Sequence, residues 1–473
     1  MNRLYYGDCL TIMQEMPLGS VDLIYLDPPF NSNRDYNGIY TDETGRPLPD
    51  QIEAFCDTWT LNEESERAAR TMPVLMREAG VDDEIAEFWR LWMNALRKTN
   101  PKVLAYLVYM TQRLLPMRGL LKPTGSLYLH CDPTASHYIK IMMDAIFGHD
   151  QFQNEFIWYY SGGGASKKRW ARKHDVILFY SAGKKWTFNA DIVRVPYKWQ
   201  SGQKRADGSP RDYEKGKLAD DVWQHHYLMP WAKERMGYAT QKPVALLERI
   251  ISASSNFGDT VFDPFCGCAT TIEAAHKLGR KWIGCDIAIH AIKRVASVRL
   301  RDRLGLKEGV DFEIEGVPRN MEGARDLWER DKYHFQKWAV EQVDGFVTAK
   351  KGSDGGIDGR IYFDQPGMKD LQSMVVEVKG GTNVGIGVVR DLRGVLERET
   401  AQMAGLIVMD DLGERKTRNF AKEMAMAGDL NVMGVAYPRM QMLTAREIFD
   451  GKRFLTPSVA KARGLAQPSL PLG

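Results

Sequence analysis

Apolar runs of strand length open the chain and predict an α/β fold. Residues 3–6 and 21–26 are short, mostly apolar runs, and residues 9–16 between them carry apolar side chains at helical spacing. The segment therefore predicts strand, helix, strand. The second strand is nearly continuous in its apolar character, which is typical of a strand covered on both faces of a sheet.

The next part of the chain predicts a mostly helical insertion at about 45–121. It begins in a turn-rich stretch at Gly45-Arg46-Pro47, and one helical stripe in it is an amphipathic packing face. That stripe consists of Phe88, Leu91, Trp92, Ala95 and Leu96. Residues 122–125 then predict a turn and residues 126–130 a strand, followed by a helix.

A later segment predicts one complete βαβ unit. A helix starts at 240–243, a strand over 260–262 ends in a glycine-containing loop, and a helix covers 272–278. The next strand, 282–285, ends at Asp286. A carboxylate at that place is suited to ribose hydroxyls, and the loop lets a ligand approach backbone amides at a helix N-terminus.

The last third of the chain predicts a second, smaller α/β domain. Residues 305–331 are polar and poorly periodic, so we expect a linker there, followed by a domain over 332–455 and a tail over 456–473. The expected elements of the domain are a helix around 335–343, strands at 360–363, 373–380 and 405–409, and a helix at 388–396.

The composition is that of an ordinary globular protein. The 473 residues are 44% hydrophobic and 26% charged, with a net charge of +3, which is enough chain for two or three domains. Six scattered cysteines form no paired C-x-x-C motif, so we expect no zinc site and a reducing cytoplasm. We also expect no secretion signal, no membrane span and no P-loop.

Basic and aromatic residues alternate over a long irregular stretch. Between about 160 and 235 many lysines and arginines are interleaved with Trp158, Trp170, Trp186 and Trp199. Most charge runs are solvated surface loops. The length of this stretch and its aromatic residues favour a DNA-contacting recognition region, in which the cations contact phosphates and some side chains read base edges.

The strand over 21–26 delivers a group of side chains that suits a flat base. It ends in Asp27-Pro28-Pro29-Phe30, where a carboxylate, a free carbonyl and an aromatic face can hold an exocyclic amino group. The run resembles the catalytic D-P-P-F/Y motif of amino-methylating DNA methyltransferases. The resemblance implies that Asp27 and the Pro28 carbonyl accept hydrogen bonds from the amino group of a flipped base, on which Phe30 stacks.

The βαβ unit also resembles this family. Residues 263–271 are similar to its D-P-F-x-G-x-G-T-T motif, with Ala269 in place of the last glycine. Thr240-Gln241-Lys242-Pro243 is similar to the segment that wraps the methionine end of the cofactor in this family. The resemblance implies S-adenosylmethionine as cofactor. Its expected contacts are Asp8, Thr240, Lys242, Pro243, Asp263, Phe265, Gly267, Ala269, Thr270 and Asp286.

The motifs stand in the permuted, β-class order, with the recognition region between the catalytic and the cofactor motif. The resemblance implies a Rossmann-like methyltransferase sheet over residues 1–304 that acts on double-stranded DNA. Asp27 as the first motif residue favours adenine N6 over cytosine N4, which stays the alternative.

Asp358, Glu377 and Lys379 form a second candidate site. Glu-x-Lys on one strand places both side chains on one face, and an Asp on the preceding strand completes the group. Asp358 and Glu377 can bind Mg²⁺ through oxygen ligands, and Lys379 can activate a water. A surface strand pair is the plain alternative. With its glycine-rich surroundings the group resembles Mrr-like PD-(D/E)xK restriction endonucleases.

Taken together, these features predict a single-chain restriction-modification protein, with no membrane association and with a homodimer as one option for its assembly. Three alternatives stay open: a C-terminal domain that only binds DNA, a non-catalytic DNA-binding subunit, and a nuclease that prefers modified foreign DNA.

Overall fold

The computed structural model of the chain describes residues 1–28, 59, 61–160, 167–168, 170–197, 209, 214–224, 228, 232, 234–236, 241–348, 357–365, 368, 371–381 and 384–457. It divides into two compact units. The first comprises residues 1–34, 57–286 and 295–314, and the second residues 35–56, 287–294 and 315–473. The predicted domain limits at 304 and 332 stay predictions.

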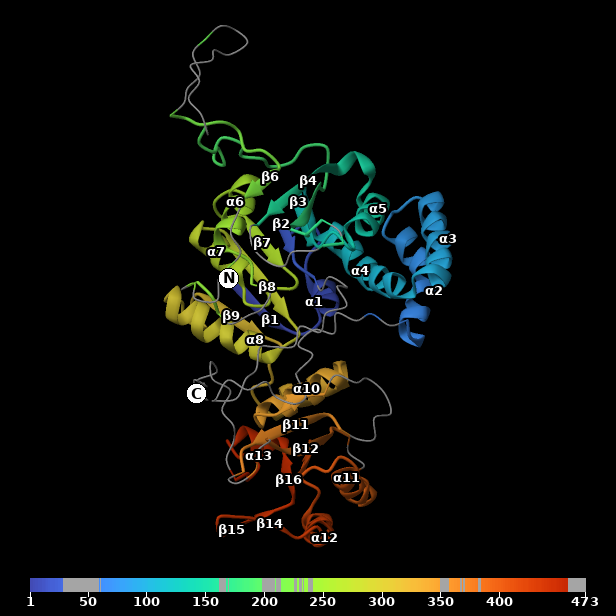
Figure 1. Cartoon of the computed structure of the whole chain (residues 1–473), viewed down its shortest axis with the longest axis vertical. Coiled ribbons are helices and arrows are strands. Elements are labelled where there is room, and N and C mark those ends of the chain that lie inside the picture. Colours follow the sequence, from blue (N-terminus) through green and yellow to red (C-terminus); the bar gives the residue numbers. More distant parts are fainter. Residues whose placement is uncertain are drawn as a thin grey trace. The chain divides into compact units, whose positions relative to one another are not determined.

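A nine-stranded sheet forms the centre of the first unit, in the order β6-β4-β5-β3-β2-β7-β8-β1-β9 (Figure 1). Strand β2 pairs in parallel with β3 and β7, and β8 pairs in parallel with β7 and β1. Strand β5 runs antiparallel to both β3 and β4. The strands are β1 (Asn2–Tyr6), β2 (Val21–Leu26), β3 (Leu121–Cys131), β4 (Phe152–Tyr159), β5 (His174–Ser181), β6 (Val222–Gln224), β7 (Thr260–Asp263), β8 (Lys281–Asp286) and β9 (Phe312–Glu315).

Helices cover both faces of this sheet (Figure 1). On one face lie α1 (Cys9–Glu15), α4 (Pro101–Leu120) and α5 (Ser136–Phe147), whose apolar side chains share one core with β2, β3 and β5. On the other lie α6 (Val244–Ser254) and α7 (Thr270–Lys277). Because both faces are covered, all six residues of β2 are buried, as its apolar run predicts.

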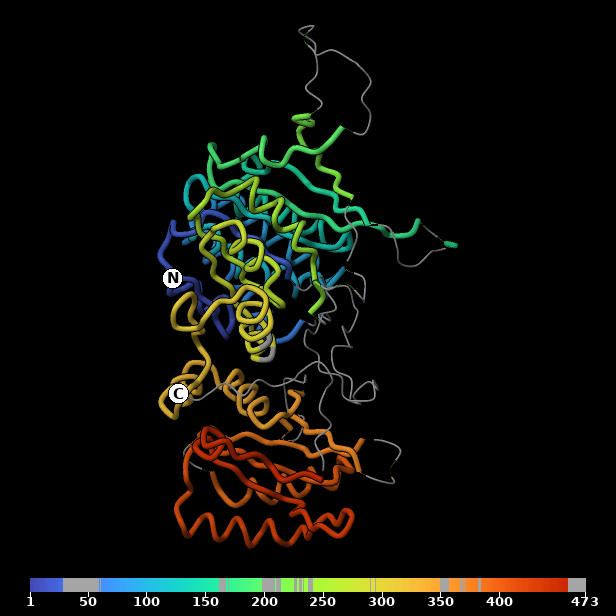
Figure 2. The backbone as a smooth tube through the Cα atoms, turned by 90° about the vertical axis from the view of Figure 1, so that its left-hand side faces the viewer, coloured from blue at the N-terminus to red at the C-terminus, as the bar shows by residue number. Residues whose placement is uncertain are grey.

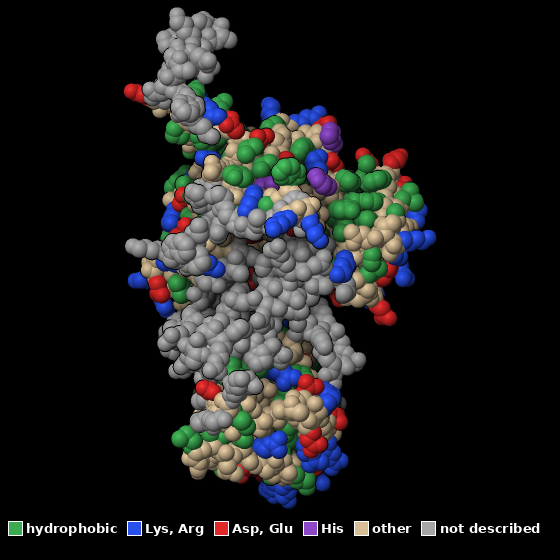
Figure 3. All heavy atoms as spheres, in the orientation of Figure 1, with side chains coloured by type: hydrophobic (Ala, Val, Ile, Leu, Met, Phe, Trp, Pro, Cys, Tyr) green, Lys and Arg blue, Asp and Glu red, His purple; other side chains and the backbone are tan. Residues whose placement is uncertain are grey.

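The described part of the predicted insertion, 45–121, contains α4, which packs on the sheet, and two helices outside it, α2 (Glu63–Glu78) and α3 (Asp83–Thr99). Phe88 and Leu91 of the predicted packing stripe are exposed, and apolar side chains gather on the surface there (Figure 3), so the stripe was wrong at these two residues. Helix α4 begins at Asn100, whose side chain accepts from the Val103 amide, with Pro101 in the first turn.

The second unit has its own five-stranded sheet, in the order β10-β11-β12-β13-β16. Helix α10 and helix α11 run on opposite sides of it (Figure 2). The strands are β10 (Phe346–Val347), β11 (Gly359–Phe363), β12 (Gln372–Lys379), β13 (Met403–Val408) and β16 (Met440–Thr444), with a separate hairpin of β14 (Asp429–Val432) and β15 (Val435–Pro438). The helices are α8 (Ile289–Arg294), α9 (Met321–Arg330), α10 (Lys332–Gln342), α11 (Gly387–Arg398), α12 (Glu414–Ala425) and α13 (Ala445–Phe449).

Two sequence expectations differ from the structure. Residues 122–125, predicted as a turn, lie inside β3. The register between β2 and β3 shifts there, so β3 has extra residues that do not pair with β2. The predicted linker at 305–331 contains β9 and α9, and α9 is capped by the Asn320 side chain. Within the described residues, no helix is both long and apolar enough to cross a membrane.

Candidate active sites

The carboxyl end of β2 presents Asp27 beside Lys242. Lys242 Nζ donates a hydrogen bond to Asp27 Oδ2 at 2.5 Å, and the two side chains are 8% and 19% exposed. Pro28 follows and is buried. Pro29, Phe30 and Thr240 lie outside the described residues, so their predicted roles stay predictions. The sequence predicts that Lys242 contacts the cofactor. In the structure Lys242 is hydrogen-bonded to Asp27, the predicted catalytic carboxylate.

The loop between β7 and α7 is a left-handed turn at a helix start. Gly267 has a φ of 48° and Ala269 a φ of 57°, and Ala269 is the N-cap residue of α7, so that Thr270 opens the helix. Only glycine adopts this conformation without a steric cost, so Ala269 adds strain where the family has glycine. The Gly267 amide donates to Asp286 Oδ2 at 2.9 Å, and this contact joins the loop to the end of β8.

Asp263 ends β7 in a fully enclosed position. Burial raises its pKa to about 7, and the nearby charges of Asp27 and Asp286 act in the same direction. The Phe265 amide donates to Asp263 Oδ1 at 3.1 Å. Three predicted carboxylates of strands β2, β7 and β8 are thus electrostatically coupled at one edge of the sheet.

Asp8 is held by a residue that the sequence analysis did not identify. Its carboxylate caps α1 by accepting from the Leu10 amide at 2.8 Å, and Arg113 Nη2 of α4 donates to its other oxygen at 2.5 Å. The Arg113 guanidinium lies 3.5 Å from the ring centre of Tyr109, whose ring centre is 6.4 Å from that of Phe265. The sequence gives one indication of this role, because Arg113 lies within the mostly apolar run of residues 103–117.

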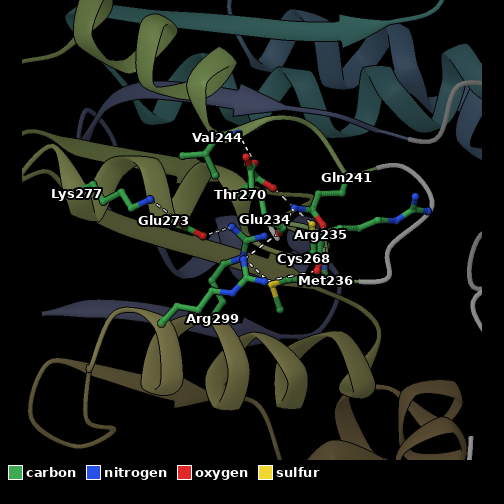
Figure 4. Close-up of polar contacts among 11 residues, drawn as sticks. Glu234, Arg235, Met236, Gln241, Val244, Cys268, Thr270, Glu273, Lys277 and Arg299 are labelled. Atoms are coloured by element: carbon green, nitrogen blue, oxygen red, sulfur yellow. Dashed lines mark hydrogen bonds and ion pairs between the residues drawn. The ribbon is translucent and has the colours of Figure 1, made fainter. Parts of the chain in front are cut away.

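A second unpredicted network supports the segment before α6 (Figure 4). Gln241 accepts from the Met236 amide at 2.7 Å and donates to the Glu234 carbonyl at 2.9 Å. The Glu234 carboxylate accepts from the Val244 amide at 2.6 Å, so it caps the helix next to Pro243, which is the N-cap residue and not a first-turn residue. These contacts fix the backbone that carries Lys242.

The same network contains a buried ion pair. Arg299 pairs with Glu273 of α7, and its Nε donates to the sulfur of Met236 at 3.0 Å. Lys277 donates to the other Glu273 oxygen at 2.6 Å. Because Arg299 is fully buried, loss of Glu273 would leave its charge without this carboxylate.

The described cysteines are not activated. Five of them are free and buried, namely Cys9, Cys131, Cys266, Cys268 and Cys285. Burial raises the pKa of Cys266 and Cys268 beside the cofactor loop, so both thiols keep their protons at neutral pH. This agrees with a site that uses no cysteine nucleophile.

The predicted recognition region, 160–235, lies partly outside the described residues, as does Trp199. Trp170 is 96% exposed in it, and Trp186 is also exposed. Trp158 is different. It lies on β4 with 3% exposure and packs edge-on against His130, so it belongs to the core of the sheet.

In the second unit Glu377 and Lys379 lie on β12, and Asp358 immediately precedes the neighbouring strand β11. The Asp358 amide donates to the Val376 carbonyl at 2.9 Å, and the Val378 amide donates to Asp358 Oδ2 at 2.7 Å, so Asp358 flanks Glu377. Lys379 Nζ lies 2.8 Å from Glu377 Oε1. Burial raises the pKa of Glu377, against the hydrogen bond from Lys379 that lowers it.

The donor set there fits a divalent cation. Glu377 is 4% exposed, and within the described part of the chain its Oε2 has no hydrogen-bond partner. A hard cation is a natural partner for a buried carboxylate oxygen beside a second carboxylate. The described residues hold no group of three or more acidic, His or Cys side chains that could bind a metal.

The open, mostly parallel sheet, the loop before α7 and the acid at the end of β8 define a nucleotide-cofactor-binding α/β protein. More specifically, the chain belongs to the N6/N4 DNA methylase family, whose model matches residues 21–297. A second model, of a restriction endonuclease of the Mrr type, matches residues 324–429. Both predicted resemblances and the predicted fold class are confirmed.

The chain is similar to individual curated proteins and to solved structures. The chain is 26% identical over 320 residues to the type II methyltransferase M.HpaI of Haemophilus parainfluenzae, which covers 67% of this chain and 80% of that protein. It is 26% identical over 295 residues to the DNA adenine methyltransferase YhdJ of Escherichia coli K12, covering 61% and 80%. The solved PvuII DNA methyltransferase (cytosine-N4-specific) is 15% identical, with a TM-score of 0.40 and coverage of 63% and 86%.

Proposed function

We propose that the first unit transfers a methyl group to the exocyclic amino group of a base flipped out of double-stranded DNA. The observation that carries the proposal is the pairing of β2 with β7, which sets Asp27 next to the loop after Asp263. The membership of the N6/N4 DNA methylase family supports S-adenosylmethionine as the cofactor. The cofactor supplies an electrophilic methyl group on a sulfonium.

The carboxylates suit that cofactor. Asp8 and Asp263 can accept hydrogen bonds from its amino groups, and Asp286 can accept from its ribose hydroxyls. The left-handed turn at Gly267 and Ala269 brings backbone close to the ligand, with Phe265, Thr270 and Pro243 around it.

Asp27 then acts on the base. Its carboxylate and the Pro28 carbonyl accept hydrogen bonds from the amino group, which makes the nitrogen lone pair more available, while Phe30 stacks on the ring. The base must leave the helix because its amino nitrogen cannot be reached inside the stack. Much of the rate would come from this positioning. Adenine is the favoured target, and the match to YhdJ, an adenine methyltransferase by name, supports it. Cytosine N4 is the alternative.

We further propose that the second unit is a Mg²⁺-dependent DNA endonuclease. Asp358 and Glu377 would hold the ion, which polarises a phosphate, and Lys379 would orient the attacking water. The match to the restriction endonuclease family supports this assignment. In one chain, methylation of a site would block its cleavage. The rival is a second unit that binds DNA without cutting it.

Methyl incorporation tests the first activity. Purified chain, unmethylated duplex DNA and labelled S-adenosylmethionine should give labelled DNA, and Asp27→Ala should abolish the label while calorimetry still shows cofactor binding. Loss of cofactor binding in that variant, or full incorporation by it, would contradict the role of Asp27.

A further inference from the structure

A chain of hydrogen-bonded side chains, two of them buried and two partly buried, runs from strand to strand across the sheet near Asp27. The Tyr25 hydroxyl lies 2.9 Å from His130 Nδ1, and His130 Nε2 lies 3.1 Å from Asp175 Oδ2. On the far side, the Tyr160 hydroxyl donates to Asp175 Oδ1 at 3.1 Å. Tyr25 is 2% exposed and His130 is fully buried. The proposed methyl-transfer chemistry uses none of these four residues.

The strand order explains this alignment. Tyr25 belongs to β2, His130 to β3 and Asp175 to β5, and these strands are neighbours in the sheet, with β4 next to β5. Because β5 runs antiparallel to β3, its first residues lie at the carboxyl end of β3, where Cys131 pairs with Val176. The sheet edge that carries Asp27 therefore also carries the start of β5.

The surroundings of Asp175 and Tyr25 determine whether each side chain is ionised. Burial raises the pKa of Asp175, but hydrogen bonds and charge from His130, the charge of Lys242 and the Tyr160 hydroxyl outweigh this and lower it overall. Burial and the nearby carboxylates hold the pKa of Tyr25 well above its usual value. Asp175 is therefore ionised and accepts from His130 Nε2 and from the Tyr160 hydroxyl, while the neutral Tyr25 hydroxyl and His130 Nδ1 share one hydrogen bond.

The two ends of the chain lie at functional places. At one end, Tyr25 comes two residues before Asp27, and the charge of Asp27 acts on the Tyr25 hydroxyl. At the other, Tyr160 and Asp175 flank a segment of the predicted recognition region. Its described part includes the exposed Trp170 and Arg172, and Arg172 Nη1 donates to Thr134 Oγ1 at 2.9 Å.

The ends of that segment are also joined through the backbone. The Tyr160 amide donates to the Lys173 carbonyl at 3.0 Å. Together with the Tyr160–Asp175 hydrogen bond, this closes the base of the segment. Tyr160, Asp175 and His130 thus form a continuous hydrogen-bonded path from the described end of the segment, residues 170–175, to the strand that leads to Asp27.

We propose that His130 and Asp175 are positioning residues that couple this segment of the recognition region to Asp27, so that contact with DNA sets the catalytic carboxylate in place. The inference rests on the proposed methyltransferase function and adds residues to its site. Neither residue touches the base in this account. Both act through Tyr25 and the strand β2.

The test uses isosteric variants of the full chain. Asp175→Asn and Tyr25→Phe each remove part of the chain without changing side-chain size. Tyr128→Phe is the matched control, because Tyr128 is also buried on β3 and its hydroxyl lies 2.6 Å from Ser254 Oγ, outside the chain. For each protein, kcat and KM for unmethylated DNA, the Kd for S-adenosylmethionine and the melting temperature are measured.

The expected result is a fall in kcat of roughly tenfold or more for Asp175→Asn and Tyr25→Phe, because small displacements of reacting groups are costly. Cofactor Kd should stay within about twofold, and Tyr128→Phe should melt earlier with kcat within about twofold. Equal kcat in the test and control variants would overturn the inference alone. No methyl incorporation by the wild-type protein would overturn the proposed function and this inference with it.

Discussion

Lys242 and Asp27 meet from 215 residues apart, with Lys242 Nζ donating to Asp27 Oδ2 at 2.5 Å. The pair lies at the carboxyl end of β2, where the proposed function places the target amino group. A second Lys–Asp pair lies at the other end of the strand, where Lys122 Nζ contacts Asp22 Oδ2 at 2.7 Å. Strand β2 thus has one Lys–Asp pair at the proposed site and a second, more exposed pair away from it.

Replacing Lys242 should impair catalysis specifically. Lys242→Met leaves Asp27 without its cation in a largely buried place, so we expect kcat for methylation to fall roughly tenfold or more. Lys122→Met removes a Lys–Asp pair of the same strand at its other end, where the lysine is more exposed, and should leave kcat within about twofold. Equal effects of the two substitutions would show that Lys242 only stabilises the fold.

Ala269 should be a strained residue. Its φ of 57° is left-handed, so Ala269→Gly is expected to raise the free energy of unfolding by about 1 kcal/mol. Ala275→Gly, at a regular position in α7, should lower it by about 1 kcal/mol. Denaturant unfolding measures both. A destabilised Ala269→Gly protein would contradict the strain.

Arg113 should support cofactor binding through Asp8. Arg113→Gln removes a buried cation from that carboxylate, which corresponds to about 1–3 kcal/mol. Calorimetry should show S-adenosylmethionine binding weakened by about tenfold. In the control, Arg97→Gln, a pair with Glu66 between α2 and α3 is lost and the affinity should not change. Unchanged affinity in Arg113→Gln would remove Asp8 from the cofactor site.

Asp263 should make stability depend on pH. Its pKa is about 7 in the folded protein against 3.8 for the ordinary carboxyl, so the unfolded chain binds fewer protons between these values. Stability should therefore fall as pH rises from about 4 to about 7 and then level off. Asp263→Asn removes this contribution, on the order of a few kcal/mol. Parallel pH curves for the two proteins would contradict the raised pKa.

The sequence predicts the parts of the site that are local in the chain. Asp263, Gly267 and Asp286 belong to one βαβ unit, whose turn residues and apolar runs can be recognised within a short stretch of sequence. The strand before Asp27 can be predicted in the same way, because a buried strand appears in the sequence as an apolar run.

The pairings across the sheet could not be predicted this way. Lys242 reaches Asp27 and His130 reaches Asp175 only because strand order brings distant segments together, and strand order is not a property of local pattern. Trp158 shows the same limit. The sequence pattern groups Trp158 with the aromatic residues of a basic region. In the structure Trp158 lies in β4 and is buried against His130.

DNA cleavage by the full chain tests the central claim most directly. Unmethylated DNA is incubated with Mg²⁺, with and without S-adenosylmethionine, using wild type, Asp27→Ala and Lys379→Ala, and fragments are separated on a gel. We predict discrete fragments from the wild type and Asp27→Ala, none from Lys379→Ala, and protection of DNA that the wild type has methylated beforehand. Intact DNA in every lane, or equal cutting of methylated and bare DNA, would contradict a single-chain restriction-modification protein.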